Sequence, residues 1–286
     1  MNDRNNQHPF TAQFKLPARV VTVVALAFGT LFGIASCTSA PRDVRFAYIE
    51  DHRIAYRVFG AGQPVVVMIS GLGDGMATFE DVATEIARSA TVIIYDRAGY
   101  GGSDAVEGAR DARAAERELS ALLDRSGVSG PYVVLGHSVG GLYAEYYASE
   151  HAEEIAALIL EDSRPADFRR ACEAAGVSMC AAPAAMAWTM PAGARSELAA
   201  LVQTEAQVEQ IAPMIGKPVL VLSRPAPERA SGFDAAWAIA QSELAARYAG
   251  ARHLTAPSGG HYIHHDEAGW FVTSVQAFLE SGDAER

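Results

Sequence analysis

Basic runs, cysteines and charged residues are all scarce in this chain of 286 residues. Its 23 lysines and arginines never form a run, 34 acidic residues outnumber them, and the formal net charge is −11. Because phosphate binding needs a positive patch, no nucleic-acid partner is expected. Charged residues make up only 20% and hydrophobic residues 50%, which excludes a disordered chain. The 25 glycines and 13 prolines are too few for collagen or low-complexity sequence.

A long apolar run is also lacking, although the N-terminal segment comes close to one. Arg4, Lys15 and Arg19 precede residues 20–35, which carry no charged side chain. This run of about 16 residues is shorter than the roughly 20 that a helix needs to cross a bilayer. A basic segment followed by a hydrophobic one is typical of a secretory signal, so residues 1–36 are predicted to be a signal peptide. An uncleaved membrane anchor is the alternative.

The end of this segment resembles the bacterial lipobox, because residues 34–37 read Ile-Ala-Ser-Cys. The resemblance implies that Cys37 is diacylated and becomes the new N-terminus, and that residues 37–43 form a lipidated tether. Two or more acyl chains hold a protein firmly at a membrane, whereas one binds marginally. The protein is therefore expected to be exported and held at the cell membrane or the outer membrane. The alternative is an ordinary secretory signal in which Cys37 has no special role.

Only three cysteines are present, and export changes what the other two imply. Cys172 and Cys180 lie close together, and in an oxidising compartment such a pair is predicted to form a disulfide. Metal binding is the alternative, but no histidine or further cysteine stands at ligand spacing beside them. No metal-binding or organic cofactor motif appears elsewhere, so no cofactor is predicted.

From residue 44 onward, apolar strand patterns alternate with helical ones. Residues 65–69 form a continuous apolar run, which suits a strand buried on both faces. The other expected strands cover 44–49, 54–59, 91–95, 132–135, 158–160, 219–222 and 252–256, and the expected helices cover 76–88, 109–125, 139–149, 235–247 and 267–280. This alternation predicts an α/β domain over residues 44–286, with a doubly wound, mostly parallel sheet. Residues 164–213 lack strand patterns, so they are predicted to be a small helical cap.

A G-x-S-x-G motif over residues 136–140 is the strongest chemical signal. It directly follows the expected strand 132–135 and directly precedes the helix that begins at Val139. This is the context of a nucleophile elbow, a sharp turn that exposes a serine at the carboxyl edge of the sheet. Ser138 is therefore predicted to be the nucleophile.

Further motifs resemble those of the α/β-hydrolase superfamily over nearly the whole chain after residue 43. Residues 70–73 (SGLG) resemble its oxyanion loop, residues 95–103 (YDRAGYGGS) its D-R-x-G-x-G-x-S turn, and residues 259–261 (GGH) its late histidine segment. The resemblance implies a serine hydrolase in which His261 is the base, with His264 as the alternative. The oxyanion donors would be the backbone amides of Leu72 and Val139.

The acid of the triad is the most open assignment. The superfamily's chain order places it between the serine and the histidine. Asp162 follows the strand 158–160 and is preferred, with Glu228 and Asp234 as alternatives. Alternatively, Asp162 has no catalytic role and only caps a turn or a helix where the 164–213 segment begins.

These residues predict an exported serine hydrolase, most simply a carboxylesterase acting on a small-molecule ester through a Ser138 acyl-enzyme. Amide or peptide hydrolysis, as in an aminopeptidase, is the first alternative and would need an acidic pocket for a substrate amine. A catalytically inactive hydrolase fold that acts as a binding lipoprotein is the second. Four apolar cap residues are expected either to line an acyl pocket or to form the core of the cap: Met179, Met186, Trp188 and Met190.

Overall fold

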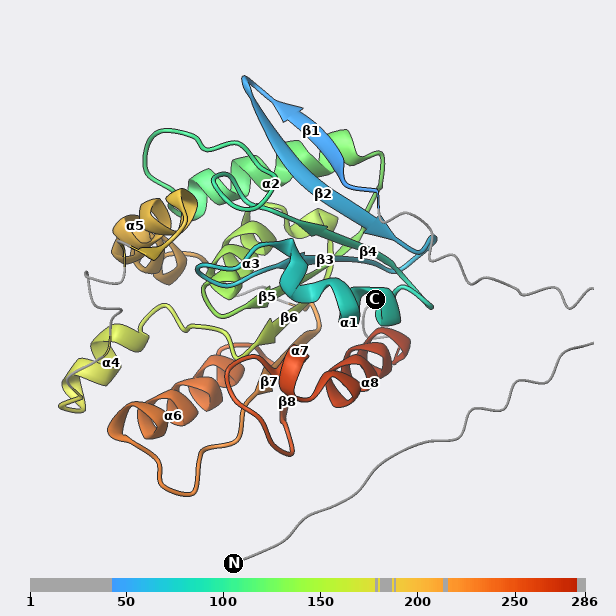
Figure 1. Cartoon of the computed structure of the whole chain (residues 1–286). Coiled ribbons are helices and arrows are strands. Elements are labelled where there is room, and N and C mark those ends of the chain that lie inside the picture. Colours follow the sequence, from blue (N-terminus) through green and yellow to red (C-terminus); the bar gives the residue numbers. More distant parts are fainter. Residues whose placement is uncertain (1–42, 178–179, 181–186, 188, 213–215, 282–286) are drawn as a thin grey trace, which may run out of the picture. The chain divides into compact units, whose positions relative to one another are not determined.

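The apolar runs of the sequence form one eight-stranded sheet in the computed structural model of the protein (Figure 1). The structure describes residues 43–177, 180, 187, 189–212 and 216–281. The sheet has the strand order β1-β2-β4-β3-β5-β6-β7-β8. The strands are β1 (Arg45–Ile49), β2 (His52–Phe59), β3 (Val65–Ile69), β4 (Thr91–Tyr95), β5 (Tyr132–His137), β6 (Ile155–Glu161), β7 (Val219–Ser223) and β8 (Arg252–Thr255).

The six strands β3 to β8 run parallel to one another. Strands β1 and β2 form a hairpin at one edge of the sheet, where β2 pairs antiparallel with β4. The predicted doubly wound, mostly parallel sheet is therefore confirmed. Parallel strands end at the same edge of the sheet, and in open α/β sheets ligands bind outside those carboxyl ends. The loops that follow β3, β5, β6, β7 and β8 meet at that edge.

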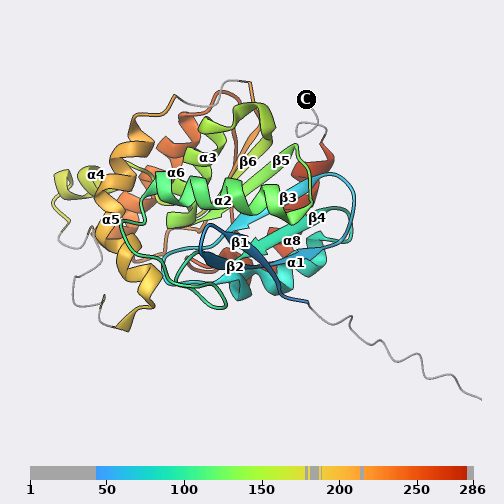
Figure 2. The ribbon, with the colours of Figure 1, turned by 90° about the horizontal axis from the view of Figure 1, so that it is seen from above.

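Helices cover both faces of the sheet (Figure 2). One apolar cluster joins α2 and α3 to one face, and a second joins α1 and α8 to the other. Both faces of the central strands are therefore apolar, and every residue of β3, VVVMI, is buried. The helices are η1 (Met76–Phe79), α1 (Glu80–Ile86), α2 (Ala112–Ser126), α3 (Val139–Glu150), η2 (Ala152–Glu154), α4 (Phe168–Ala174), α5 (Ala192–Glu209), α6 (Gly232–Ala246), α7 (Ile263–Asp266) and α8 (Ala268–Glu280).

Among the element boundaries that differ from the expectations, two have clear local reasons. The helix expected from residue 109 begins only at Ala112, because the Asp111 side chain caps it by accepting the Ala114 N–H at 2.9 Å. The helix expected over residues 76–88 consists of the short 3-10 turn η1 and then α1. At its start, the Met76 N–H donates to the Asp96 carboxylate at 2.7 Å, which ties this turn to the end of β4.

Between β6 and β7 the chain contributes helices only, within the residues that the structure describes there. Helix α4 begins seven residues after β6, and α5 packs against α2 and α3. As predicted, a disulfide joins Cys172 of α4 to Cys180, with the two Cα atoms 5.7 Å apart. The described residues of this segment are therefore helical where they have regular structure, and the helical cap over residues 164–213 stays a prediction.

Several predicted features lie outside the described residues. They are the signal peptide over 1–36, Cys37 and most of its tether, and the cap residues Met179, Met186 and Trp188. Within the described ranges, every helix is too short or too polar to cross a membrane.

Candidate active site

Ser138 occupies a sharp turn between β5 and α3. Its backbone is in an uncommon region for a residue other than glycine, with φ of 54° and ψ of −123°. The turn needs glycines on both sides, because a Cβ atom on Gly136 would lie 2.5 Å from the Gly140 carbonyl oxygen. A Cβ atom on Gly140 would lie 2.3 Å from the Ile69 carbonyl oxygen. The packing of β5, α3 and the end of β3 thus forces Ser138 out at the carboxyl edge of the sheet.

A continuous line of hydrogen bonds runs from Ser138 through His261 to Asp162. The Ser138 Oγ lies 2.9 Å from His261 Nε2, and His261 Nδ1 lies 2.6 Å from Asp162 Oδ2. His261 comes from the loop between β8 and α7, and Asp162 directly follows β6. Since Nδ1 donates to the carboxylate, Nε2 is left to accept the serine proton. The structure therefore brings together the three residues that the sequence placed at the site.

Asp162 is completely buried, and its carboxylate takes part in three hydrogen bonds. Its Oδ1 accepts the Trp237 indole N–H at 3.0 Å and the Arg224 backbone N–H at 3.2 Å, while Oδ2 faces His261. Its φ is 36°, in the left-handed region that Asp and Asn tolerate better than other side chains. This hydrogen bonding holds the carboxylate in one orientation toward the imidazole.

The two alternative acids lie elsewhere. Glu228 is exposed in the loop after β7. Asp234 belongs to the capping box of α6, where it bonds Ser231, and it also accepts from Arg224 Nη2 at 3.1 Å. Neither bonds His261, so Asp162 is the acid that the geometry supports. Trp237 and Arg224, which orient it, carried no signal in the sequence because they come from a helix and a loop far along the chain.

The loop expected to hold the oxyanion lies against the nucleophile. A Cβ atom on Gly71 would lie 3.2 Å from the Ser138 Cβ, so this close approach depends on glycine. Leu72 and Val139, whose amides are the expected donors, both line the same pocket as Ser138. The position of both residues beside Ser138 fits an oxyanion site made of backbone N–H groups.

A buried arginine anchors this loop. Arg97, from the segment resembling the D-R-x-G-x-G-x-S turn, donates to the Ser70 carbonyl at 2.7 Å and to the Gly71 carbonyl at 2.9 Å. Its charge is balanced by Glu197 of α5, with Nε 2.6 Å from the carboxylate. Tyr100 donates to the same carboxylate at 2.6 Å. The oxyanion loop is therefore tied to a helix of the insertion by a fully buried ion pair.

Replacing Glu197 with glutamine is expected to lower the free energy of unfolding by about 3–5 kcal/mol, because it leaves the Arg97 charge buried without its counterion. Both side chains of the pair are at most 1% exposed. Urea unfolding measures the change. Glu85→Gln is the matched control, since it breaks the exposed pair with Arg88 and should cost less than about 1 kcal/mol. If Glu197→Gln lowers the free energy of unfolding no more than the control does, the buried ion pair does not stabilise the fold.

His264, the alternative base, is directed away from Ser138. Its Nδ1 lies 2.7 Å from Glu161 Oε1, and its Nε2 lies 3.0 Å from the Thr78 hydroxyl. Burial lowers the pKa of His264 to about 3 and raises the pKa of the Glu161 carboxyl to about 7. His137, next to the nucleophile, is completely buried and donates from Nε2 to the His261 carbonyl at 2.9 Å. These three side chains pack beneath the triad and support the backbone of its histidine.

The contribution of His137 to the free energy of unfolding is expected to decrease as pH falls from about 6.5 toward 4. Burial lowers the pKa of this imidazole to about 4, whereas in the unfolded chain it takes up a proton near pH 6.5. The unfolded state thus binds more protons in this window, which costs up to about 1.4 kcal/mol per pH unit. His137→Gln keeps an N–H donor but lacks this titration.

The destabilisation of His137→Gln relative to the wild type should therefore be larger at pH 7 than at pH 5. Urea unfolding of both proteins at the two pH values measures it. If the two proteins differ in free energy of unfolding by the same amount at pH 7 and at pH 5, His137 does not resist protonation in the folded protein.

A pocket of about 340 Å³ opens beside the triad. This is within the range of small-molecule sites. Five of its described lining residues had no assignment in the sequence, namely Arg164, Leu201, Arg224, Phe233 and Trp237, and the others are Leu72, Ser138, Val139 and His261. Met190, the one described residue of the expected acyl pocket, is not among them.

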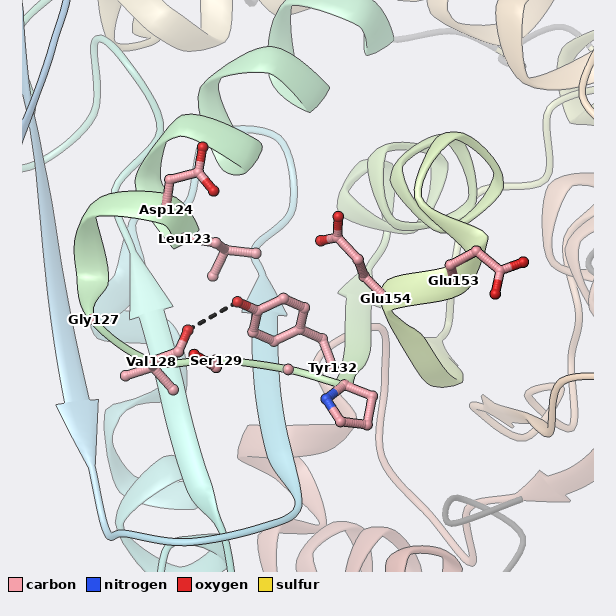
Figure 3. A pocket seen from close by; sticks show the side chains of 10 residues that line it. Leu123, Asp124, Gly127, Val128, Ser129, Tyr132, Glu153 and Glu154 are labelled. Atoms are coloured by element: carbon pink, nitrogen blue, oxygen red, sulfur yellow. Dashed lines mark hydrogen bonds between the residues drawn. The ribbon is translucent and has the colours of Figure 1, made fainter.

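A larger hollow of about 580 Å³ lies at the opposite edge of the sheet (Figure 3). Its lining residues include Asp124, Glu153 and Glu154, and two further ones are joined by a hydrogen bond, in which the Tyr132 hydroxyl donates to the Val128 carbonyl at 2.9 Å. Tyr132 begins β5, whereas Ser138 follows the end of that strand, so roughly 20 Å of strand separates the two sites. None of the triad residues reaches this hollow. Among the described residues, no group of three His, Cys, Asp or Glu side chains could hold a metal ion.

Comparison with known proteins agrees with this fold. Residues 64–179 match the family model described as alpha/beta hydrolase fold. An uncharacterized protein of Mycobacterium tuberculosis is 32% identical over 124 residues, which are 42% of this chain and 35% of the relative. A putative carbamate hydrolase of Azorhizobium caulinodans is 30% identical over 129 residues, 44% of this chain and 48% of the relative. The alignments thus span less than half the length of these curated relatives.

The fold also matches solved structures. An enol-lactonase from Burkholderia xenovorans superposes with a TM-score of 0.63 at 20% identity, covering 82% of this chain and 99% of the other. At this identity the likeness concerns the fold alone.

Proposed function

From the α/β-hydrolase fold that this chain adopts, we propose that it is a serine hydrolase that cleaves carboxylic esters of small molecules. The hydrogen-bonded line from Ser138 through His261 to Asp162, beside a pocket, is the observation that carries this proposal. A free serine hydroxyl is a weak nucleophile and becomes reactive only when a base can take its proton and a third group orients that base. The nucleophile, the base and the acid of this reaction would be these three side chains, and the backbone amides of Leu72 and Val139 are the proposed oxyanion donors.

In the first half of the reaction, Ser138 Oγ attacks the ester carbonyl carbon while its proton passes to His261 Nε2. The backbone amides of Leu72 and Val139 stabilise the oxyanion that forms. The tetrahedral intermediate then breaks its bond to the leaving oxygen, which takes the proton from Nε2 and departs as an alcohol. In the second half, water gives a proton to Nε2 and attacks the acyl-enzyme, and the collapse returns that proton to Ser138 and releases the acid. The Asp162 carboxylate stabilises the imidazolium that forms.

Labelling with a fluorophosphonate, together with turnover of short-chain esters, tests the proposal. The wild type should carry the label on Ser138, identified by mass spectrometry of the peptide, and should hydrolyse the esters. A wild type that neither labels nor turns over any ester would instead be a hydrolase fold that acts as a binding protein. Including an amide, a carbamate and a peptide in the same panel compares C–N with C–O cleavage.

The pocket favours an ester over an aminopeptidase substrate. An aminopeptidase needs a carboxylate facing the substrate amine, but no aspartate or glutamate is among the described residues that line the pocket. The permanently charged residues of this lining are two arginines, whose N–H groups cannot accept a hydrogen bond from a substrate ammonium group. We therefore place amide and peptide hydrolysis behind ester hydrolysis.

We further propose that the hydrolase works outside the cytoplasm, anchored by a lipid on Cys37 after removal of residues 1–36. The lipobox resemblance of residues 34–37 supports this location. Metabolic labelling with a palmitate analogue should mark the wild type and not Cys37→Ser. Equal labelling of both proteins would refute the anchor and leave the enzymatic proposal untouched.

A further inference from the structure

Two arginines line the pocket that holds Ser138 and His261, although the chain as a whole has a formal net charge of −11. Apart from Arg164 and Arg224, the described lining is apolar or belongs to the triad. Arginine presents a planar fork of N–H donors that matches a carboxylate. A pocket whose walls combine apolar surface with two such forks favours a substrate that bears an anionic group.

Hydrogen bonds hold both the backbone and the side chain of Arg164 in place beside Ser138. Its backbone N–H donates to the Ser138 carbonyl at 2.9 Å. Its Nε and Nη2 both donate to Glu205 Oε1, at 2.9 and 2.7 Å, and the side chain is 10% exposed. Glu205 does not line the pocket, and Nη1 has no hydrogen-bond partner among the described residues. The guanidinium is thus held rigidly with donors left over.

Arg224 is held in a similar way on the next strand of the sheet. It follows β7, its Nη2 donates to Asp234 at 3.1 Å, and its Nε lies 3.6 Å from Asp162. The side chain is 20% exposed, and its Nη1 also lacks a partner within the part of the chain that the structure describes. Neither Asp162 nor Asp234 lines the pocket. A substrate in the pocket therefore meets the two arginines and not the carboxylates that neutralise them.

We propose that the substrate carries a carboxylate a few atoms from its scissile carbonyl, and that Arg164 and Arg224 bind this carboxylate. The inference rests on the proposed function, since it names the substrate class of the same site. It predicts a short acid ester or an acid-bearing lactone as substrate, and a hydroxy acid or dicarboxylate among the products. Because acidic residues balance both arginines, recognition depends on directional hydrogen bonds more than on long-range attraction.

Hydrolysis of monomethyl glutarate and dimethyl glutarate by the wild type is the first test, because these esters differ in the free carboxylate. The value of kcat/KM for the acid ester should exceed that for the diester by tenfold or more. Equal values, or a preference for the diester, would overturn the proposal. Glutarate should also inhibit turnover of a neutral ester competitively, and butyrate should do so at least tenfold more weakly.

Arg164→Gln tests the residue itself. The ratio of the two kcat/KM values should fall by about 10- to 100-fold, the range for losing a hydrogen bond to a charged group. Using the ratio cancels any loss of active protein. Arg169→Gln is the matched control, because Arg169 bonds the same Glu205 at 3.2 Å but does not line the pocket, so the ratio should stay unchanged. A ratio unchanged in Arg164→Gln would remove Arg164 from substrate recognition.

Calorimetric titration with glutarate separates this inference from the proposed function, because it needs no turnover. The wild type should bind glutarate, and Arg164→Gln should bind it at least tenfold more weakly. Glutarate binding by a protein that neither carries the fluorophosphonate label nor hydrolyses any ester would refute the hydrolase and retain the carboxylate site. Ester turnover without selective binding of glutarate would retain the hydrolase and refute the carboxylate site.

Discussion

Replacing Ser138 with alanine is expected to reduce kcat for ester hydrolysis by about 10⁴- to 10⁶-fold, the range for loss of the nucleophile from such a triad. The backbone at position 138 is already strained, with φ of 54° in the wild type, so alanine adds no new strain there. The variant also leaves the glycines that the elbow requires in place. It should therefore fold and still bind substrate while losing the covalent step.

Steady-state kinetics with a short-chain ester, and fluorophosphonate labelling of the same samples, measure this loss. Ser242→Ala is the control, because Ser242 is exposed on α6 and, among the described residues, bonds only the Ala238 carbonyl of its own helix. It should label and turn over as the wild type does. Residual activity of Ser138→Ala above about 10% would show that another residue is the nucleophile.

Replacing Asp162 with asparagine is expected to lower kcat by about 10³- to 10⁴-fold. Asparagine has the same shape and tolerates the positive φ of 36° at this position. Its amide cannot accept from His261 Nδ1 as a charged carboxylate does, so the imidazole loses both its orientation and the charge that stabilises the imidazolium. The effect on rate should therefore be far larger than the effect on folding.

Two variants provide matched controls for the acid. Glu228→Gln changes an exposed side chain and should leave kcat close to that of the wild type. Asp234→Asn weakens the capping box of α6 and its bond to Arg224, so it should cost about 1 kcal/mol of stability and much less rate than Asp162→Asn. A loss of 10³-fold or more in either control, with Asp162→Asn near the wild type, would assign the acid to that residue.

The position of Ser138 could be predicted because it depends on short-range pattern. A buried strand, a turn with glycines at 136 and 140, and a helix beginning at Val139 are consecutive in the chain, so local sterics alone place the serine at the turn. His261 could be predicted nearly as well, since it lies between the last strand and the final helices. The sequence could not exclude His264, whose burial against Glu161 depends on the neighbouring β6.

The sequence by itself determined the α/β class, the parallel sheet and the serine at its carboxyl edge, because hydrophobic periodicity and turn chemistry act over a few residues. Only the tertiary structure decided which carboxylate faces His261, because Asp162, Glu228 and Asp234 all satisfy the same chain order. It also brought Arg164, Arg224 and Trp237 to one pocket from the ends of β6 and β7 and from α6. Contacts between residues 60 to 100 positions apart leave no periodic trace in a single sequence, since they arise only when the strands align and the helices pack on them.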